Sequence, residues 1–74
     1  MIDRETATEL AKWIRDNEGR DAECTAEYVA GELTQGLRVE GYFYSLRELD
    51  LPENRESFIN GDFDSIRARR RHDP

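Results

Sequence analysis

The chain has 74 residues, of which 38% are charged and 36% hydrophobic, and its formal net charge is -6. This length leaves room for one domain with one modest core. The longest strongly apolar run covers the three residues Tyr42 to Tyr44, which excludes a membrane span, and no apolar stretch typical of a secretion signal follows Met1. We therefore expect a single soluble, cytoplasmic domain.

Charge is distributed unevenly along the chain. Residues 1–66 carry 7 basic and 16 acidic side chains, whereas residues 67–74 carry four arginines and one aspartate. This predicts an acidic domain over 1–66 followed by a basic, flexible tail over 67–74. Ten of the 11 basic residues are arginine, a bias typical of a GC-rich or salt-adapted genome.

The first predicted element is a helix near the N-terminus. Thr6 and Glu9 have the spacing of a capping box, and Asp3 is an alternative cap one turn earlier. Gly19 suits the left-handed residue that follows a helix. The stripe that this helix would bury consists of Ala7, Leu10, Ala11 and Ile14.

A second helix is predicted from Thr25 to about Gly36. The Thr25 hydroxyl can cap the first free amides. Ala26, Val29, Ala30 and Leu33 recur at helical spacing, so we expect them to form its buried face.

Residues 37–49 fit two interpretations. As a helix, the segment places Val39, Tyr42, Phe43, Leu46 and Leu49 within an arc of roughly 120°. As a strand, it places Leu37, Val39 and Phe43 on one face. Gly41 weakens the helix and the aromatic residues favour the strand. The helix is favoured because Leu46 and Leu49 continue its stripe.

The C-terminal third is also open to two interpretations. Pro52 ends the preceding element. Asn60-Gly61 is a hairpin signal between two short apolar segments. The alternative is a helix from Asp62 through Arg71 with Phe63 and Ile66 directed inward.

The order of elements over residues 8–49 resembles the winged helix-turn-helix family. A helix ends in Trp13-Ile14, Thr25 opens a second helix with Val29-Ala30 and Leu33, and Val39 to Leu49 follows a turn that contains a glycine. The resemblance implies a mainly α (α+β) fold, with a three-helix helix-turn-helix core and a short C-terminal β-hairpin wing or fourth helix. The connection before Val39 is longer than is usual in that family, and Gly41 is unusual inside a recognition helix.

The resemblance also implies a small DNA-binding transcriptional regulator. Its partner would be double-stranded DNA, bound by a possible homodimer. The residues expected to approach the major groove are Arg38, Tyr44, Ser45 and Arg47, and those expected to contact phosphate are Arg67, Arg69, Arg70 and Arg71.

The alternative hypothesis is an acidic protein-binding module, an inhibitor or adaptor of the kind that phages encode. The outward face of the expected third helix carries two acids and one base, unlike a helix that reads DNA. An acidic body attracts basic protein surfaces. The residues expected to bind such a surface are Glu40, Tyr44 and Glu48.

Residues that could support catalysis or metal binding are scarce. His72 is the only histidine and Cys24 the only cysteine, so neither a nucleophile paired with a histidine base nor a zinc site is expected. Asn60, Asp62 and Asp64 match the start of a calcium loop, but Ser65 stands where the loop needs glycine. We expect no enzyme activity, no cofactor and no metal.

Overall fold

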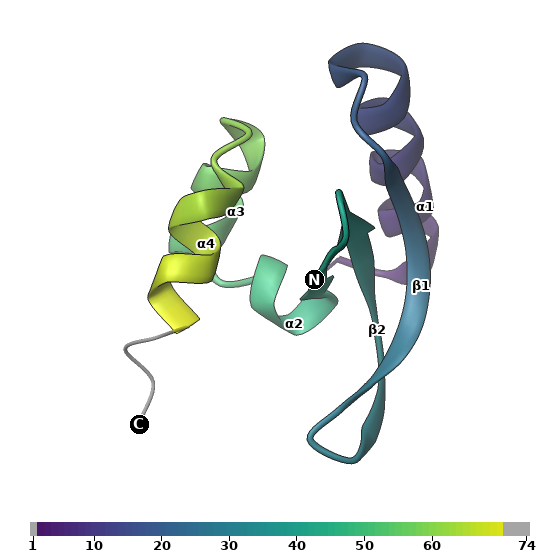
Figure 1. Cartoon of the computed structure of the whole chain (residues 1–74), viewed down its shortest axis with the longest axis vertical. Helices are drawn as coiled ribbons and strands as arrows, with labels where there is room; N and C mark the ends of the chain where they lie inside the picture. The colour runs from purple at the N-terminus through teal and green to yellow at the C-terminus, as the bar shows by residue number, and fades with distance from the viewer. Residues whose placement is uncertain (1, 71–74) are drawn as a thin grey trace.

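The computed structural model describes residues 2–70. In chain order its elements are α1 (Arg4–Trp13), η1 (Ile14–Glu18), β1 (Ala22–Val29), β2 (Glu32–Val39), β3 (Tyr42–Ser45), α2 (Leu46–Leu49), α3 (Pro52–Ile59) and α4 (Phe63–Arg70). The three strands form one antiparallel sheet in the order β1-β2-β3. In Figure 1, α1 lies beside β1, and α2 to α4 form a second, separate group. Both groups contribute side chains to a single core on one face of the sheet.

Helix α1 confirms the first predicted element. Asp3 is the cap, because its carboxylate accepts a hydrogen bond of 2.8 Å from the Thr6 amide. The helix widens into the π-helical turn η1 and ends at Gly19, whose φ of 66° is left-handed. Ala7, Ala11 and Ile14 are buried, as the predicted stripe requires.

The predicted second helix is wrong. Residues 22–39 form the β1–β2 hairpin, in which Ala22 lies opposite Val39 and Val29 opposite Glu32. The expected buried face fails as well, since Val29 and Leu33 are exposed. The buried positions of β2 are instead Gly36, Leu37 and Val39, where alternate side chains pack toward the core.

The favoured helix over residues 37–49 is also wrong, and the strand interpretation is confirmed for much of this segment. Gly41 lies in a turn between β2 and β3, and only Leu46–Leu49 are helical. The turn places Tyr42 opposite Val39 and Tyr44 opposite Leu37, so Tyr44 rather than Phe43 is buried among the core side chains. The chain is therefore a small α+β domain, without the three-helix core and C-terminal wing that the sequence led us to expect.

No hairpin forms at Asn60-Gly61. These residues connect α3 to α4, and Gly61 has a left-handed φ of 72°. The alternative helix is confirmed over Phe63–Arg70, with Phe63 and Ile66 buried. Arg67, Arg69 and Arg70, predicted to belong to a flexible tail, lie in this helix. Arg71 and the three residues after it lie outside the described residues.

The core lies between the sheet and the helices. One face of the sheet packs against α1 and also against α2 and α4, which lie next to α1 on that same face. The Tyr44 ring centre is 5.1 Å from that of Phe63, which in turn is 5.5 Å from Phe58. The buried hydrophobic residues are Ala7, Ala11, Ile14, Ala22, Leu37, Val39, Tyr44, Leu49, Phe63 and Ile66.

Both hairpins turn through two residues with positive φ. The values are 51° and 83° for Ala30-Gly31 and 51° and 87° for Glu40-Gly41. Positive φ at both central positions defines a type I′ turn, which matches the twist of the strands it joins. Ala30 and Glu40 adopt a conformation that asparagine tolerates better.

We therefore expect Ala30→Asn to stabilise the protein by about 0.5–1 kcal/mol, because asparagine is favoured at the first central position of this turn. Urea denaturation checks the change. Thr25→Asn, on the same hairpin but away from the turn, is the control. A loss of stability in Ala30→Asn would contradict the turn type.

Candidate protein-binding surface

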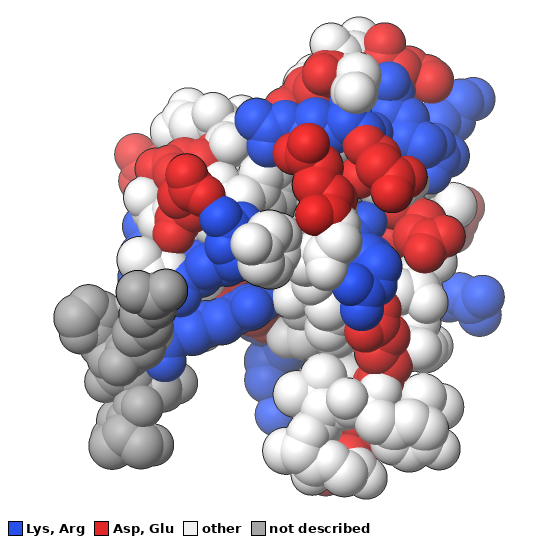
Figure 2. All heavy atoms as spheres, in the orientation of Figure 1, with Lys and Arg blue, Asp and Glu red and all other residues white. Residues whose placement is uncertain are grey.

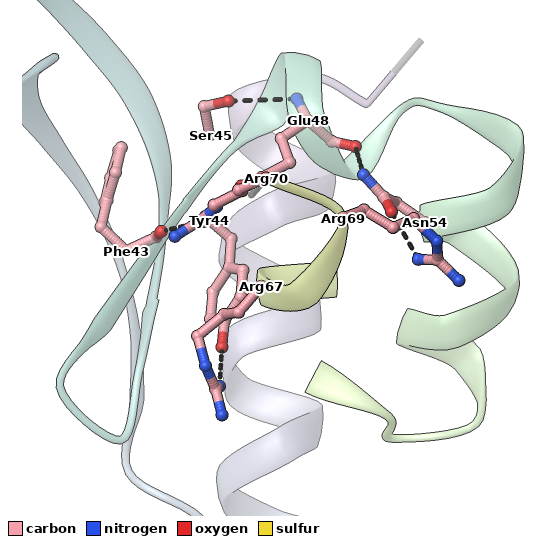
Figure 3. Close-up of polar contacts among 8 residues, drawn as sticks. All are labelled: Phe43, Tyr44, Ser45, Glu48, Asn54, Arg67, Arg69 and Arg70. Carbon is pink, nitrogen blue, oxygen red and sulfur yellow. Dashed lines mark hydrogen bonds and ion pairs between the residues drawn. The ribbon is translucent and has the colours of Figure 1, made fainter. Parts of the chain in front are cut away.

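The three described arginines of the expected phosphate clamp bind their own chain (Figure 3). Arg67 donates a hydrogen bond of 2.6 Å to the Tyr44 hydroxyl, and its guanidinium carbon lies 4.1 Å from the Tyr42 ring centre. Arg70 holds both carboxylate oxygens of Glu48 at 2.5 Å and the carbonyl of Phe43 at 2.5 Å.

The third arginine, Arg69, joins α4 to α3. It donates to Asn54 Oδ1 at 2.7 Å and to Ser57 Oγ at 2.8 Å, and Asn54 in turn donates to the carbonyl of Glu48 at 2.8 Å. The three arginines thus fasten α4 to β3, α2 and α3. Bound in this way, they are poorly placed to wrap a phosphate backbone.

These contacts shift the pKa values of the groups involved. Glu48, which accepts two hydrogen bonds from Arg70, raises the pKa of that guanidinium. Burial raises the pKa of the Tyr44 hydroxyl, and Arg67 opposes part of this effect. Both pKa shifts favour the protonated forms at neutral pH, in which Arg70 is a cation beside Glu48 and Tyr44 is a neutral hydroxyl that accepts from Arg67.

The residues expected to read bases do not share one surface. Arg38 pairs with Glu27 and donates to the Gly41 carbonyl at 2.6 Å. Tyr44 is buried, and Ser45 caps α2 by accepting from the Glu48 amide at 3.0 Å. Arg47 is exposed on α2, and within residues 2–70 the structure gives its side chain no hydrogen bond or ion pair.

The residues expected to bind a basic protein are likewise dispersed. Glu40 lies in the β2–β3 turn, 3.6 Å from Arg20. Glu48 is held by Arg70, and Tyr44 is inside the core. The acidic-module hypothesis therefore needs a different surface.

The end of the β1–β2 hairpin supplies such a surface. It projects beyond the helices in Figure 1, and its atoms in Figure 2 are mostly uncharged. We call residues 28–33 the hairpin end. Tyr28 and Leu33 lie opposite each other, are 76% and 63% exposed, and continue the face that is buried nearer the helices. Val29, on the other face, is 45% exposed.

Exposed apolar side chains are common singly, but three on a projecting end are typical of an interaction surface. The tight turn holds them in place without a long loop. Sequence reasoning missed this surface because it assigned Val29 and Leu33 to a buried helical stripe. The signal that could have revealed it is the repeat of Ala30-Gly31 and Glu40-Gly41 at a spacing of ten residues, each glycine in the second place of a two-residue turn.

A second apolar surface lies between α1 and α3. It is a groove of about 400 Å³, lined mainly by Ile2, Leu10, Trp13, Leu49, Phe58 and Ile59. Ile59 is 80% exposed at its rim. None of the groove's lining residues belongs to the hairpin end.

The described residues hold no group of three or more histidine, cysteine or acidic side chains placed to bind a metal ion. Over the same residues, no helix has the length and apolar character needed to cross a membrane. No family model, curated protein or solved structure matches the chain.

Proposed function

We propose that the chain is a protein-binding module that inserts its hairpin end into an apolar pocket of a partner protein. The observation that carries this proposal is the exposure of Tyr28, Val29 and Leu33 on one rigid projection. Aromatic and large aliphatic anchors that fill pockets supply most of the energy of many interfaces.

Charge favours a partner with a basic rim around its pocket. The net charge of the chain is -6, and Glu32 at the hairpin end is exposed. A field of this sign accelerates association with basic surfaces and opposes association with nucleic acid. The recognition helix expected over Val39 to Leu49 is replaced by the end of β2, the turn, β3 and the four residues of α2, which weakens the DNA-binding hypothesis.

Substitution at the hairpin end tests the proposal. Immobilised wild-type chain should retain a partner from a lysate of the source organism, and Leu33→Asp should weaken binding of the purified partner by about thirtyfold, equivalent to about 2 kcal/mol. Leu33 is exposed, so the change should leave the fold intact, which circular dichroism checks.

Ile59→Asp is the matched control, because it places the same charge on another exposed apolar residue, beside the α1–α3 groove. The control should bind the partner like wild type. Loss of binding in Ile59→Asp with retention in Leu33→Asp would move the site to the groove. Binding of duplex DNA that weakens steeply with salt would instead support the nucleic-acid hypothesis.

A further inference from the structure

Strand β2 is longer than the strand beside it. Strand β3 pairs only with Gly36 to Val39, and after Ser45 the chain turns into α2. The outer half of β2, residues 32–35, pairs with β1 on one side. On its other side, among residues 2–70, no strand pairs with it.

The direction of the backbone groups follows from two hydrogen bonds. The Glu40 amide donates to the Asp21 carbonyl at 2.9 Å, so Asp21 faces β2. The Ala22 carbonyl faces the opposite way and accepts from Arg15. In an antiparallel ladder these directions alternate from one residue pair to the next. Leu33 lies opposite Tyr28, and Gln35 lies opposite Ala26. Both β2 residues therefore direct their amides and carbonyls away from β1, toward the open edge.

An arginine side chain bonds to the backbone at one point on each of the two outer edges of the sheet. Arg70 binds the carbonyl of Phe43 at 2.5 Å on the outer side of β3, and Arg15 binds the carbonyl of Ala22 at the start of β1. Natural sheets cover or charge their edges in such ways, since an open edge is a template for another strand. Among residues 2–70, no side chain or strand is bonded to the backbone of the outer half of β2 on the side away from β1.

A hollow of about 510 Å³ runs along this open edge. It extends from Ala30 at the turn to Leu46 and Arg47 at the start of α2, and residues of both sheet faces line it, Leu33 and Gln35 from one and Thr34 and Ser45 from the other. A second hollow of about 480 Å³ adjoins it on the face of Val29 and Phe43. A strand laid along the edge would direct alternate side chains to opposite faces of the sheet.

We propose that the outer half of β2 is a strand-addition site for an extended segment of the partner protein. This inference rests on the proposed function and names its mode: the partner adds a strand beside Glu32–Gln35 while its pocket receives the hairpin end. The main-chain hydrogen bonds to Leu33 and Gln35 supply affinity, and the two hollows select the alternate side chains.

The lining charges specify the segment further. Glu32 lies at the turn end of the edge hollow and Arg47 at its α2 end. The adjoining hollow is lined by Val29 and Phe43 and by the ion pair of Glu48 with Arg70. The added segment should therefore carry apolar side chains at alternate positions. It should also carry a basic residue beside Glu32 and an acidic residue beside Arg47.

The test uses two chains made by chemical synthesis. N-methylation of Gln35 removes an amide that faces the proposed strand, and N-methylation of Ala26, opposite it in the register, removes an amide that faces the other edge. The probe is the tightest binder selected from a library of displayed ten-residue peptides. We expect N-methyl-Gln35 to weaken binding more than tenfold and N-methyl-Ala26 to change it less than twofold.

The bound peptide should also slow hydrogen exchange of the Leu33 and Gln35 amides. Equal losses in the two methylated chains, protection of the Ala26 and Tyr28 amides instead, or failure of the library to yield any binder would overturn the proposal. Formation of a dimer that N-methyl-Gln35 dissociates would make a second copy of the chain the occupant, and would overturn it as well.

The partner captured in the lysate experiment separates this inference from the proposed function. Tyr28→Asp changes the hairpin end on β1 and leaves the β2 edge intact. If Tyr28→Asp loses the partner and N-methyl-Gln35 keeps it, insertion of the hairpin end stands and strand addition fails. If both variants keep the partner, both proposals fail.

Discussion

Tyr44→Ala is expected to unfold most of the protein, whereas Tyr42→Ala should leave it folded. Both rings lie on the same face of β3, but Tyr44 is fully buried and Tyr42 is 51% exposed. Removing a large buried ring costs about 3–5 kcal/mol. A domain of this size rarely has more than about 3–5 kcal/mol of stability from its core.

Urea denaturation measures both variants, and Tyr44→Phe separates the ring from the hydroxyl. The phenylalanine variant keeps the contact with Phe63 but loses the hydrogen bond from Arg67. It should cost about 1.5–3 kcal/mol, the range for a hydrogen bond to a charged group. Equal stability of Tyr44→Ala and Tyr42→Ala would show that the register of β3 differs from the one described.

Gly36→Ala should destabilise the protein by about 3 kcal/mol, a large effect for the addition of one methyl group. A β-carbon at this position would overlap the backbone carbonyl oxygen of Tyr44 and lie 2.6 Å from Cζ of Phe43. A ring can swing aside, but the carbonyl belongs to the paired strand β3 and cannot move without disturbing the ladder.

Two further variants identify which contact matters. Gln35→Ala, at the exposed neighbouring position, should change stability by less than about 0.5 kcal/mol. In a Phe43→Ala background, Gly36→Ala should remain destabilising, because the clash with the Tyr44 carbonyl persists. Full recovery in that background would assign the whole effect to the ring and contradict the role of the backbone.

The N-terminal helix was predictable because its signals are local. Asp3, Thr6 and Gly19 act within one or two turns of the chain, and Ala7, Ala11 and Ile14 repeat at a helical spacing that no competing element disturbs. The helix α4 was visible as an alternative for the same reason, since Phe63 and Ile66 are spaced by three residues.

The sheet was not predictable in the same way. Val29 and Leu33 flank the two-residue turn of the hairpin and are four residues apart in the chain. The same spacing is typical of a helical stripe. Whether such a segment forms a helix or a hairpin is decided by what covers it, since Leu37 and Val39 are buried by α1 and by later helices. Strand preference depends on tertiary context more than helix preference does.

The residues of the two predicted sites are dispersed for a related reason. The candidate residues were grouped on the assumed face of one helix, from Arg38 to Glu48. In the structure that segment spans parts of two strands, a turn and α2, so its residues point in several directions. The arginines of α4 have helical spacing, but no nearby sequence signal indicates that their side chains bind Tyr44, Glu48 and Asn54.

The order of the strands has a consequence for the speed of folding. Each strand pairs with its immediate neighbour along the chain, and each connection closes over two residues. Short loops cost little entropy to close, and topologies rich in local contacts reach the native state quickly. The slowest step should be the return of α4, because Arg67 and Arg70 must find Tyr44 and Phe43 across 23 and 27 residues of chain. Until that step is complete, the outer side of β3 is a further open edge, and the nascent domain is at its most vulnerable to pairing with the wrong strand.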